Sequence, residues 1–196
     1  MTTAEKPLLV WDVDDVLNSL MRIYVERGLP DGARRIPYAG ITVNPPHELL
    51  EITRDEYLVS LDRVRAAGFY DLPPRSEVSE FFAEYGSRFD HAVLSAVPMR
   101  FMPDSAAWVL HHFGRWIQNL FFIPSPRPEQ KTASQLFATK AEAMAFLGRR
   151  AVLIDDSPAN VGAVAKAGGR ARLFPAPWNE GAKMSAEYFL KELSAI

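Results

Sequence analysis

The sequence predicts an α/β protein with a Rossmann-like, doubly wound parallel sheet and a small helical cap inserted after the first strand. Five short apolar runs contain the β-branched and aromatic residues typical of strands, and helical patterns separate the later runs. The runs are apolar almost throughout instead of alternating between apolar and polar residues. This pattern indicates a parallel sheet covered by helices on both faces.

The expected strands occupy residues 8–13, 91–95, 119–123, 151–155 and 171–174. The expected helices of the same region occupy residues 103–114, 140–148, 157–169 and 185–196. In the first of these helices Ala107, Leu110 and Phe113 recur at the spacing that defines one helix face. The third begins with Ser157 and Pro158 and ends in two glycines, which are residues that commonly begin and end helices.

The segment from residue 19 to residue 87 interrupts this rhythm. A stretch punctuated by Gly and Pro covers residues 28–50, and helical patterns follow at 53–68 and 74–86. No clear core strand lies between residues 13 and 91. We therefore expect residues 1–18 and 88–196 to form a catalytic core, with 19–87 as a cap packed over the sheet.

Composition limits the class of protein. The chain of 196 residues is 48% hydrophobic and 23% charged, which suits one core with a small second lobe. Its net charge of −2 gives no support for a nucleic-acid polymer or a membrane as partner. The absence of cysteine excludes disulfides and thiolate metal sites. No signal peptide or apolar run of about 20 residues is present, so we expect a soluble, cytoplasmic protein, and nothing indicates its oligomeric state.

Acidic residues stand at the ends of two expected strands. Asp12 and Asp14 follow the first apolar run, and residues two apart in an extended chain point the same way. Asp155 and Asp156 follow the fourth run. Parallel sheets bind ligands at the edge where the carboxyl ends of their strands meet. We therefore expect a site of carboxylate oxygens suited to Mg²⁺, which would offset the cost of burying several like charges.

Two further positions at this edge fit a phosphate group. Ser95 closes the strand 91–95 and offers a hydroxyl, followed by the backbone N–H of Ala96. Lys140 stands at the start of the helix after the third strand. A hydroxyl and an ammonium group suit a phosphate dianion. Alone, a serine here is most often a turn residue and a lysine a surface residue, so the prediction depends on their occurring together.

Taken in order, these motifs resemble the four motifs of the haloacid dehalogenase superfamily. They read VWDVDD, VLSAVP, TKAEAMAFL and VLIDDSPAN, and the resemblance covers residues 8–17 and 91–175. It implies a phosphatase that depends on Mg²⁺ and acts through an aspartyl-phosphate. Asp12 would be the nucleophile. Asp14 would protonate the leaving oxygen and then activate water, a role that speaks against dehalogenase or phosphonatase chemistry.

The resemblance also implies how the ligands are held. Mg²⁺ would be bound by the Asp12 carboxylate, the Asp14 backbone carbonyl and the Asp155–Asp156 pair, in which Asp156 aligns with the direct ligand. Asp155 and Asn160 align with residues that surround the ligands. The phosphoryl oxygens would be gripped by residues at the second and third strand ends, namely Ser95, Ala96 and Lys140.

Within the superfamily the chain looks most similar to the 5'(3')-deoxyribonucleotidase-like group. The stretches that carry this looser resemblance are GFYDLPPRSEVSEFF, AAWVLHHFG and LFPAPWN. It implies a small phosphorylated substrate such as a nucleoside monophosphate. Tyr57, Phe69 and Tyr70 are then candidates for contact with the substrate, although packing in the core is the commoner role of such aromatic residues.

Two departures and several alternatives remain open. The residue after the second aspartate is usually glycine in the superfamily, but here it is Asp15. Lys131 follows the third strand more closely than Lys140 does, but a lysine at a helix start can reach the carboxyl edge of the sheet, so Lys140 is favoured. A phosphotransferase, a phosphomutase or a phosphate-binding relative without activity would share the same motifs. A receiver domain is disfavoured, since its paired acids precede its lone phosphoacceptor.

Overall fold

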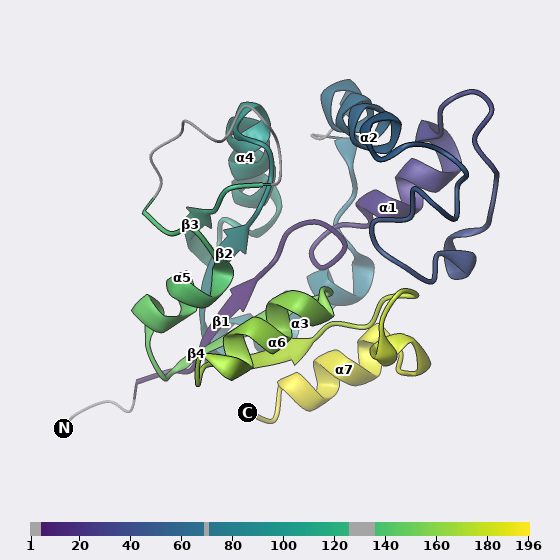
Figure 1. Ribbon diagram of the computed structural model, residues 1–196. Helices are drawn as coiled ribbons and strands as arrows, with labels where there is room; N and C mark the ends of the chain where they lie inside the picture. The colour runs from purple at the N-terminus through teal and green to yellow at the C-terminus, as the bar shows by residue number, and fades with distance from the viewer. Residues whose placement is uncertain (1–4, 69–70, 126–135) are drawn as a thin grey trace.

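The computed structural model describes residues 5–68, 71–125 and 136–196, which form a five-stranded parallel sheet flanked by helices (Figure 1). The strands lie in the spatial order β3-β2-β1-β4-β5, and every neighbouring pair is parallel. All five predicted strands are confirmed: β1 (Leu8–Trp11), β2 (Asp90–Ser95), β3 (Ile117–Phe122), β4 (Ala151–Asp155) and β5 (Arg170–Leu173).

The central strand β1 is level with its two neighbours at the carboxyl edge. Trp11 pairs with Val93 of β2 and with Ile154 of β4. The Asp12 backbone N–H extends the second pairing by donating to the Ile154 carbonyl at 2.9 Å. Residues that follow β1, β2 and β4 therefore come together at one edge, where open parallel sheets place their ligands.

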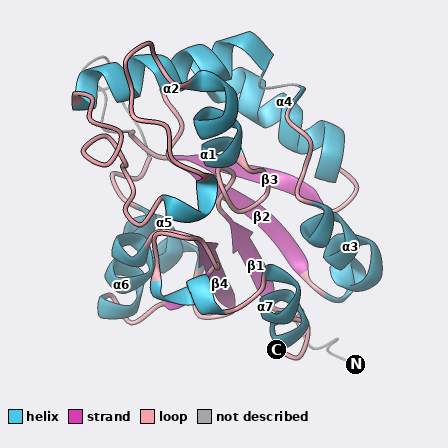
Figure 2. Ribbon diagram, turned by 90° about the vertical axis from the view of Figure 1, so that its right-hand side faces the viewer, coloured by secondary structure: helices cyan, strands magenta, loops and turns pink. Residues whose placement is uncertain are grey.

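Side chains of β1 alternate between two hydrophobic clusters, one on each face of the sheet. Leu9 and Trp11 lie in the cluster that includes buried residues of α3 (Ser76–Tyr85), α4 (Met102–Phe113) and α7 (Ala186–Leu193). Leu8 and Val10 lie in the other, which includes residues of α5 (Lys140–Leu147) and α6 (Pro158–Lys166). Figure 2 shows these two helical layers on opposite sides of the strands. The doubly wound architecture is thus as predicted.

Local capping explains where the helices of the core begin and end. The Thr139 hydroxyl accepts a hydrogen bond from the Glu142 N–H at the start of α5, and the Ser157 hydroxyl accepts one from Asn160 at the start of α6. Gly148 adopts a φ of +84° just after α5, a conformation that glycine adopts without steric cost.

The helix face that carries Ala107, Leu110 and Phe113 is only partly buried in α4. Phe113 is buried as expected, but Leu110 is 47% exposed. The buried stripe of this helix runs instead through Ser105, Trp108 and Val109 to Phe113. An apolar pattern fixes the period of a helix, whereas packing against the sheet decides which of its apolar positions is covered.

The segment between β1 and β2 contains α1 (Leu20–Ile23), a π-helical turn (Tyr24–Gly28), α2 (Arg54–Gly68) and α3. Figure 1 shows α1 and α2 together beyond the carboxyl end of β1. By contrast α3 packs on the sheet, where its Phe81 and Phe82 rings lie 5.6 and 5.1 Å from that of Trp11. Among the described residues, no helix combines the length and the apolar character needed to span a bilayer.

Candidate active site

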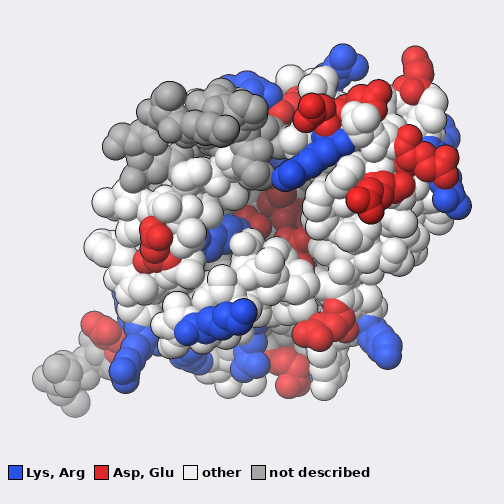
Figure 3. All heavy atoms as spheres, in the orientation of Figure 1, with Lys and Arg blue, Asp and Glu red and all other residues white. Residues whose placement is uncertain are grey.

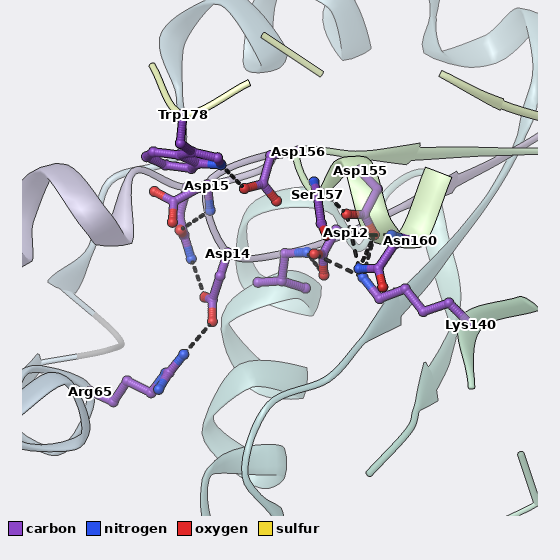
Figure 4. A network of polar contacts seen from close by, with 12 residues as sticks. Asp12, Asp14, Asp15, Arg65, Lys140, Asp155, Asp156, Ser157, Asn160 and Trp178 are labelled. Carbon is purple, nitrogen blue, oxygen red and sulfur yellow. Dashed lines mark hydrogen bonds and ion pairs between the residues drawn. The ribbon is translucent and has the colours of Figure 1, made fainter. Parts of the chain in front are cut away.

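Three aspartates gather at the carboxyl edge of the sheet. Asp12 follows β1, Asp155 ends β4, and Asp156 follows it; one carboxylate oxygen of each lies within 4.8 Å of one oxygen of each of the others. Asp155 is fully buried and Asp156 is 5% exposed. Figure 4 shows Asp12 between the other two acids, which come from the neighbouring strand. The parallel sheet therefore brings Asp12 to the Asp155–Asp156 pair as predicted, whereas the Asp14 carboxylate does not point with that of Asp12 into this cluster.

Lys140 is the cation within this cluster. It is buried at the first turn of α5, and its Nζ lies 2.8 Å from Asp12 Oδ2 and 2.6 Å from Asp155 Oδ2. Asn160 Nδ2 lies 3.1 Å from both oxygens of Asp155, and the Ser157 N–H donates to Asp155 Oδ1. Asp155 is thus held by three residues, whereas within the described part of the chain Asp12 accepts the Val13 N–H alone besides its ion pair.

The clustering of buried charges perturbs their pKa values. Burial raises the pKa of Asp12 to about 7; Lys140 opposes this shift, and the neighbouring Asp155 adds to it. Burial also raises the pKa of Asp156 well above its usual range, with Asp155 as the next cause. Burial lowers the pKa of Lys140, but Asp12 and Asp155 outweigh it and raise that pKa above its ordinary value. The ammonium group therefore stays charged, whereas Asp12 takes up a proton near neutral pH.

Asp14 faces the other way, toward the segment between β1 and β2. Its Oδ1 accepts from Asn18 Nδ2 at 3.2 Å, and its Oδ2 forms an ion pair of 2.7 Å with Arg65 of α2. Arg65 also contacts Asp62 at 2.9 Å, and Asp62 contacts Arg100 at 2.6 Å. This chain of four charged groups connects α2 with the loop after β1 and with the loop after β2.

Asp15 stands at the position where the resemblance led us to expect glycine, and its backbone adopts a conformation that suits glycine. Its φ is +63°, in the left-handed region that glycine enters freely and aspartate tolerates better than most residues. The Asp15 N–H donates to Asn18 Oδ1, and its own Oδ1 accepts the Met21 N–H at 2.8 Å. Side-chain hydrogen bonding thus stabilises a turn that glycine would form without it.

The remaining predicted residues are less closely tied to the cluster. Ser95 is buried at the end of β2, one pairing position beyond Asp12, and Ala96 after it lines the cavity described next. Tyr57 is buried on α2 with its ring edge-on to that of Tyr24, so it packs as well as lining the cavity. The other three candidates, Lys131, Phe69 and Tyr70, lie outside the described residues.

A cavity of about 280 Å³ opens above the aspartates. Its floor contains Asp12, Asp14, Asp15 and Asp156, and Figure 3 shows acidic side chains at the bottom of a hollow on this face. One wall is the stripe of α2 made by residues three or four apart: Arg54, Tyr57, Leu58, Leu61 and Arg65. The cavity therefore joins an acidic floor to a wall that is apolar in the middle with an arginine at each end.

Two residues of this site carry no signal that sequence reasoning detected. Arg65 shares the helical stripe of Arg54 and Leu61, so a periodicity analysis of α2 directed at the site would have included it. Trp178 donates its indole N–H to Asp156 Oδ2 at 2.8 Å from a loop after β5. Its stretch LFPAPWN stood out from the sequence only by its looser resemblance, and the contact with Asp156 depends on tertiary placement, which the local sequence does not indicate.

The residues fit a divalent cation. Three carboxylates surround one region while one ammonium group offsets only part of their charge, and carboxylate oxygens are the donors that Mg²⁺ prefers. The ligands would be Asp12 and Asp156 with Asp155 beside them. A cation held there would oppose both causes that raise the pKa of Asp12 and Asp156, namely burial and the neighbouring carboxylates.

Comparison with known proteins gives a consistent result for the fold. No protein-family model and no curated protein matches the sequence. Similar solved structures include a haloacid dehalogenase-like family hydrolase from Streptococcus pneumoniae, at 13% identity and a TM-score of 0.53, with 86% of this chain and 84% of that chain covered. A candidate β-phosphoglucomutase from Thermotoga maritima gives 16% identity and a TM-score of 0.52, with 96% and 99% covered.

A third similar structure is a predicted phosphoglycolate phosphatase from Haemophilus somnus. It has 15% identity and a TM-score of 0.53, with 87% of this chain and 85% of that chain covered. At these identities the likeness concerns the fold. These three structures are thus described as a haloacid dehalogenase-like hydrolase, a β-phosphoglucomutase and a phosphoglycolate phosphatase, and none of the three is described as a nucleotidase. The chain shares the α/β fold of haloacid dehalogenase-like hydrolases.

Proposed function

We propose that the protein is a phosphatase that depends on Mg²⁺ and hydrolyses small phosphomonoesters through an aspartyl-phosphate on Asp12. The observation that carries the proposal is the arrangement at the end of β1. Asp12 lies among Lys140, Asp155 and Asp156, while Asp14, two residues later, reaches the cavity wall. This arrangement provides the Asp12 carboxylate beside the Lys140 ammonium group, together with acids that could bind a metal ion. The Asp14 carboxylate lies outside that group of acids.

In the first step a carboxylate oxygen of Asp12 attacks phosphorus, and the bond from phosphorus to the leaving oxygen breaks. Asp14 in its protonated form gives its proton to that oxygen, which leaves as an alcohol. Lys140 lies beside the attacking carboxylate and offsets the repulsion between it and the phosphate dianion. When bound, Mg²⁺ supplies further stabilisation of negative charge on the phosphoryl oxygens.

In the second step water attacks the phosphorus of the aspartyl-phosphate. Asp14, now ionised, takes a proton from that water, and the bond from phosphorus to the Asp12 oxygen breaks. Inorganic phosphate leaves and both aspartates return to their starting states. The ion pair with Arg65, whose guanidinium is itself anchored on Asp62, would hold the ionised Asp14 on the cavity side for this step.

Ser95 and the Ala96 N–H would bind the phosphoryl oxygens from the neighbouring strand end, together with Lys140. The substrate would be a small metabolite phosphate or a nucleoside monophosphate, with Tyr57 in contact with its leaving group. The apolar middle of the cavity wall supports an organic leaving group of limited size. Transfer of the phosphoryl group to another acceptor is the second candidate, since one similar structure is described as a phosphomutase.

The test is phosphate release by the purified protein with and without Mg²⁺. The substrate panel contains deoxynucleoside and nucleoside monophosphates, sugar phosphates and an aryl phosphate. Asp12→Asn is the loss-of-nucleophile variant, and Asp90→Asn, at the opposite end of β2, is the matched control. We expect release that requires Mg²⁺, disappears in Asp12→Asn and persists in Asp90→Asn. Release that Asp12→Asn retains would contradict the proposal.

A further inference from the structure

The loop after β5 is built around Asp156. The Trp178 indole N–H donates to Asp156 Oδ2 at 2.8 Å, and the Asn179 side chain donates to the Asp156 carbonyl, also at 2.8 Å. The same Asn179 amide donates to the Phe174 carbonyl at 2.9 Å. One loop therefore holds both the side chain and the backbone of this aspartate.

This loop is itself fixed by two sets of contacts. Asn179 Oδ1 accepts the N–H groups of Gly181 and Ala176, which closes the loop on its own backbone. The Trp178 ring is 9% exposed and lies edge-on to that of Tyr38, with centroids 6.0 Å apart. The indole is thus a donor with little rotational freedom.

The Asp156 carboxylate needs such a donor. Among residues 5–68, 71–125 and 136–196, the indole is its one hydrogen-bond partner, although it is buried close to other aspartates. Buried carboxylates that repel one another turn apart or change protonation unless a donor fixes them. Figure 4 shows Trp178 on one side of Asp156, with the second oxygen of Asp156 on the side of Asp12.

We propose that Trp178 is a positioning residue that orients Asp156 for a divalent cation. By engaging Oδ2, the indole leaves the other carboxylate oxygen directed toward Asp12 and Asp155. The inference rests on the proposed function, because it assigns Trp178 a part in the metal site of the same reaction. Partners of this kind typically change metal affinity by about 10–100-fold when they are removed.

The test is the affinity for Mg²⁺ of Trp178→Phe, measured by calorimetry on the metal-free protein without substrate. Phenylalanine keeps an aromatic ring against Tyr38 and removes the N–H. The matched control is Trp108→Phe, which loses a buried indole N–H bond of 2.7 Å to the Leu72 carbonyl, away from the aspartates. Urea unfolding of both variants without metal measures any general loss of stability.

We expect Trp178→Phe to bind Mg²⁺ about 10–100-fold more weakly than the wild type, with Trp108→Phe unchanged. Replacing Trp178 by 3-benzothienylalanine, in which sulfur replaces the N–H, should give the same loss in a ring of nearly the same shape. This second variant tests the role of the indole N–H even if Trp178→Phe unfolds the loop. Wild-type affinity in both Trp178 variants overturns the inference and leaves the phosphatase proposal standing. Absence of Mg²⁺ binding by the wild type overturns both.

Discussion

Replacing Lys140 by methionine tests the electrostatic account of the site without any substrate. Methionine is an unbranched side chain of similar length that lacks the ammonium group, which lies 2.8 Å from Asp12 and 2.6 Å from Asp155. At an effective dielectric constant of about 20, each of these pairs has a Coulomb energy of about 6 kcal/mol. The cost of burying the ammonium group offsets much of that energy, because burial acts against the charged form of Lys140.

The net loss in the free energy of unfolding therefore depends on the two carboxylates that remain, Asp12 and Asp155. Removing one partner of a buried ion pair costs about 3–5 kcal/mol. Asp155 keeps its contacts with Asn160 and Ser157, and Asp12 can take up a proton, so the lower end of that range applies. We expect Lys140→Met to lower the free energy of unfolding by about 3 kcal/mol at neutral pH without divalent cations.

Urea denaturation followed by Trp fluorescence measures this loss, and Mg²⁺ should restore part of it by replacing the missing charge. The control is Lys166→Met, an exposed lysine of α6, for which a change within about 0.5 kcal/mol is expected. A loss below about 1 kcal/mol in Lys140→Met, as for an exposed ion pair, would refute the account of a buried cation between two carboxylates.

Three further predictions follow from the same geometry. Lys140→Met should abolish phosphate release and Lys131→Met should retain it; the reverse result would reassign the phosphate-binding lysine. Mg²⁺ affinity should rise as the pH increases through about 7, because the Asp12 proton must leave, and calorimetry showing no pH dependence would contradict this. His91 accepts from Trp11 and donates to a backbone carbonyl, and burial lowers its pKa. As the pH falls below about 6.5, the unfolded state takes up a proton on His91 before the folded state does. The free energy of unfolding of the wild type, measured by denaturation, should therefore fall relative to that of His91→Gln, by at most about 1.4 kcal/mol per pH unit. The same pH dependence in both proteins would exclude this role.

The sheet and much of the acidic cluster could be predicted from the sequence because both depend on local order. Continuous apolar runs define buried parallel strands. A residue that ends such a strand lies at the ligand-binding edge of the sheet, independently of the conformation of the loops. Asp12 and Asp155 are therefore found by counting along the chain. The sequence only favours Lys140 over Lys131, because a lysine at a helix start can reach that edge, and the structure places Lys140 beside Asp12 and Asp155.

The other features of the site and the fold depend on contacts between segments that are distant in the sequence. Arg65 reaches Asp14 only because α2 packs beyond the end of β1, and Trp178 reaches Asp156 only through the path of the loop after β5. The exposure of Leu110 likewise depends on how α4 is turned against the sheet. Such placements are decided by the packing of whole elements, for which the residues themselves carry no local pattern.

The central claim is that Asp12 becomes phosphorylated during turnover. The most direct measurement is acid quenching of the protein during turnover of the best substrate with Mg²⁺, followed by peptide mass spectrometry. The account predicts a phosphoryl group on Asp12 that hydroxylamine removes and that Asp12→Asn lacks. Turnover without any phosphorylated aspartate, or with the phosphoryl group on another residue, would contradict it.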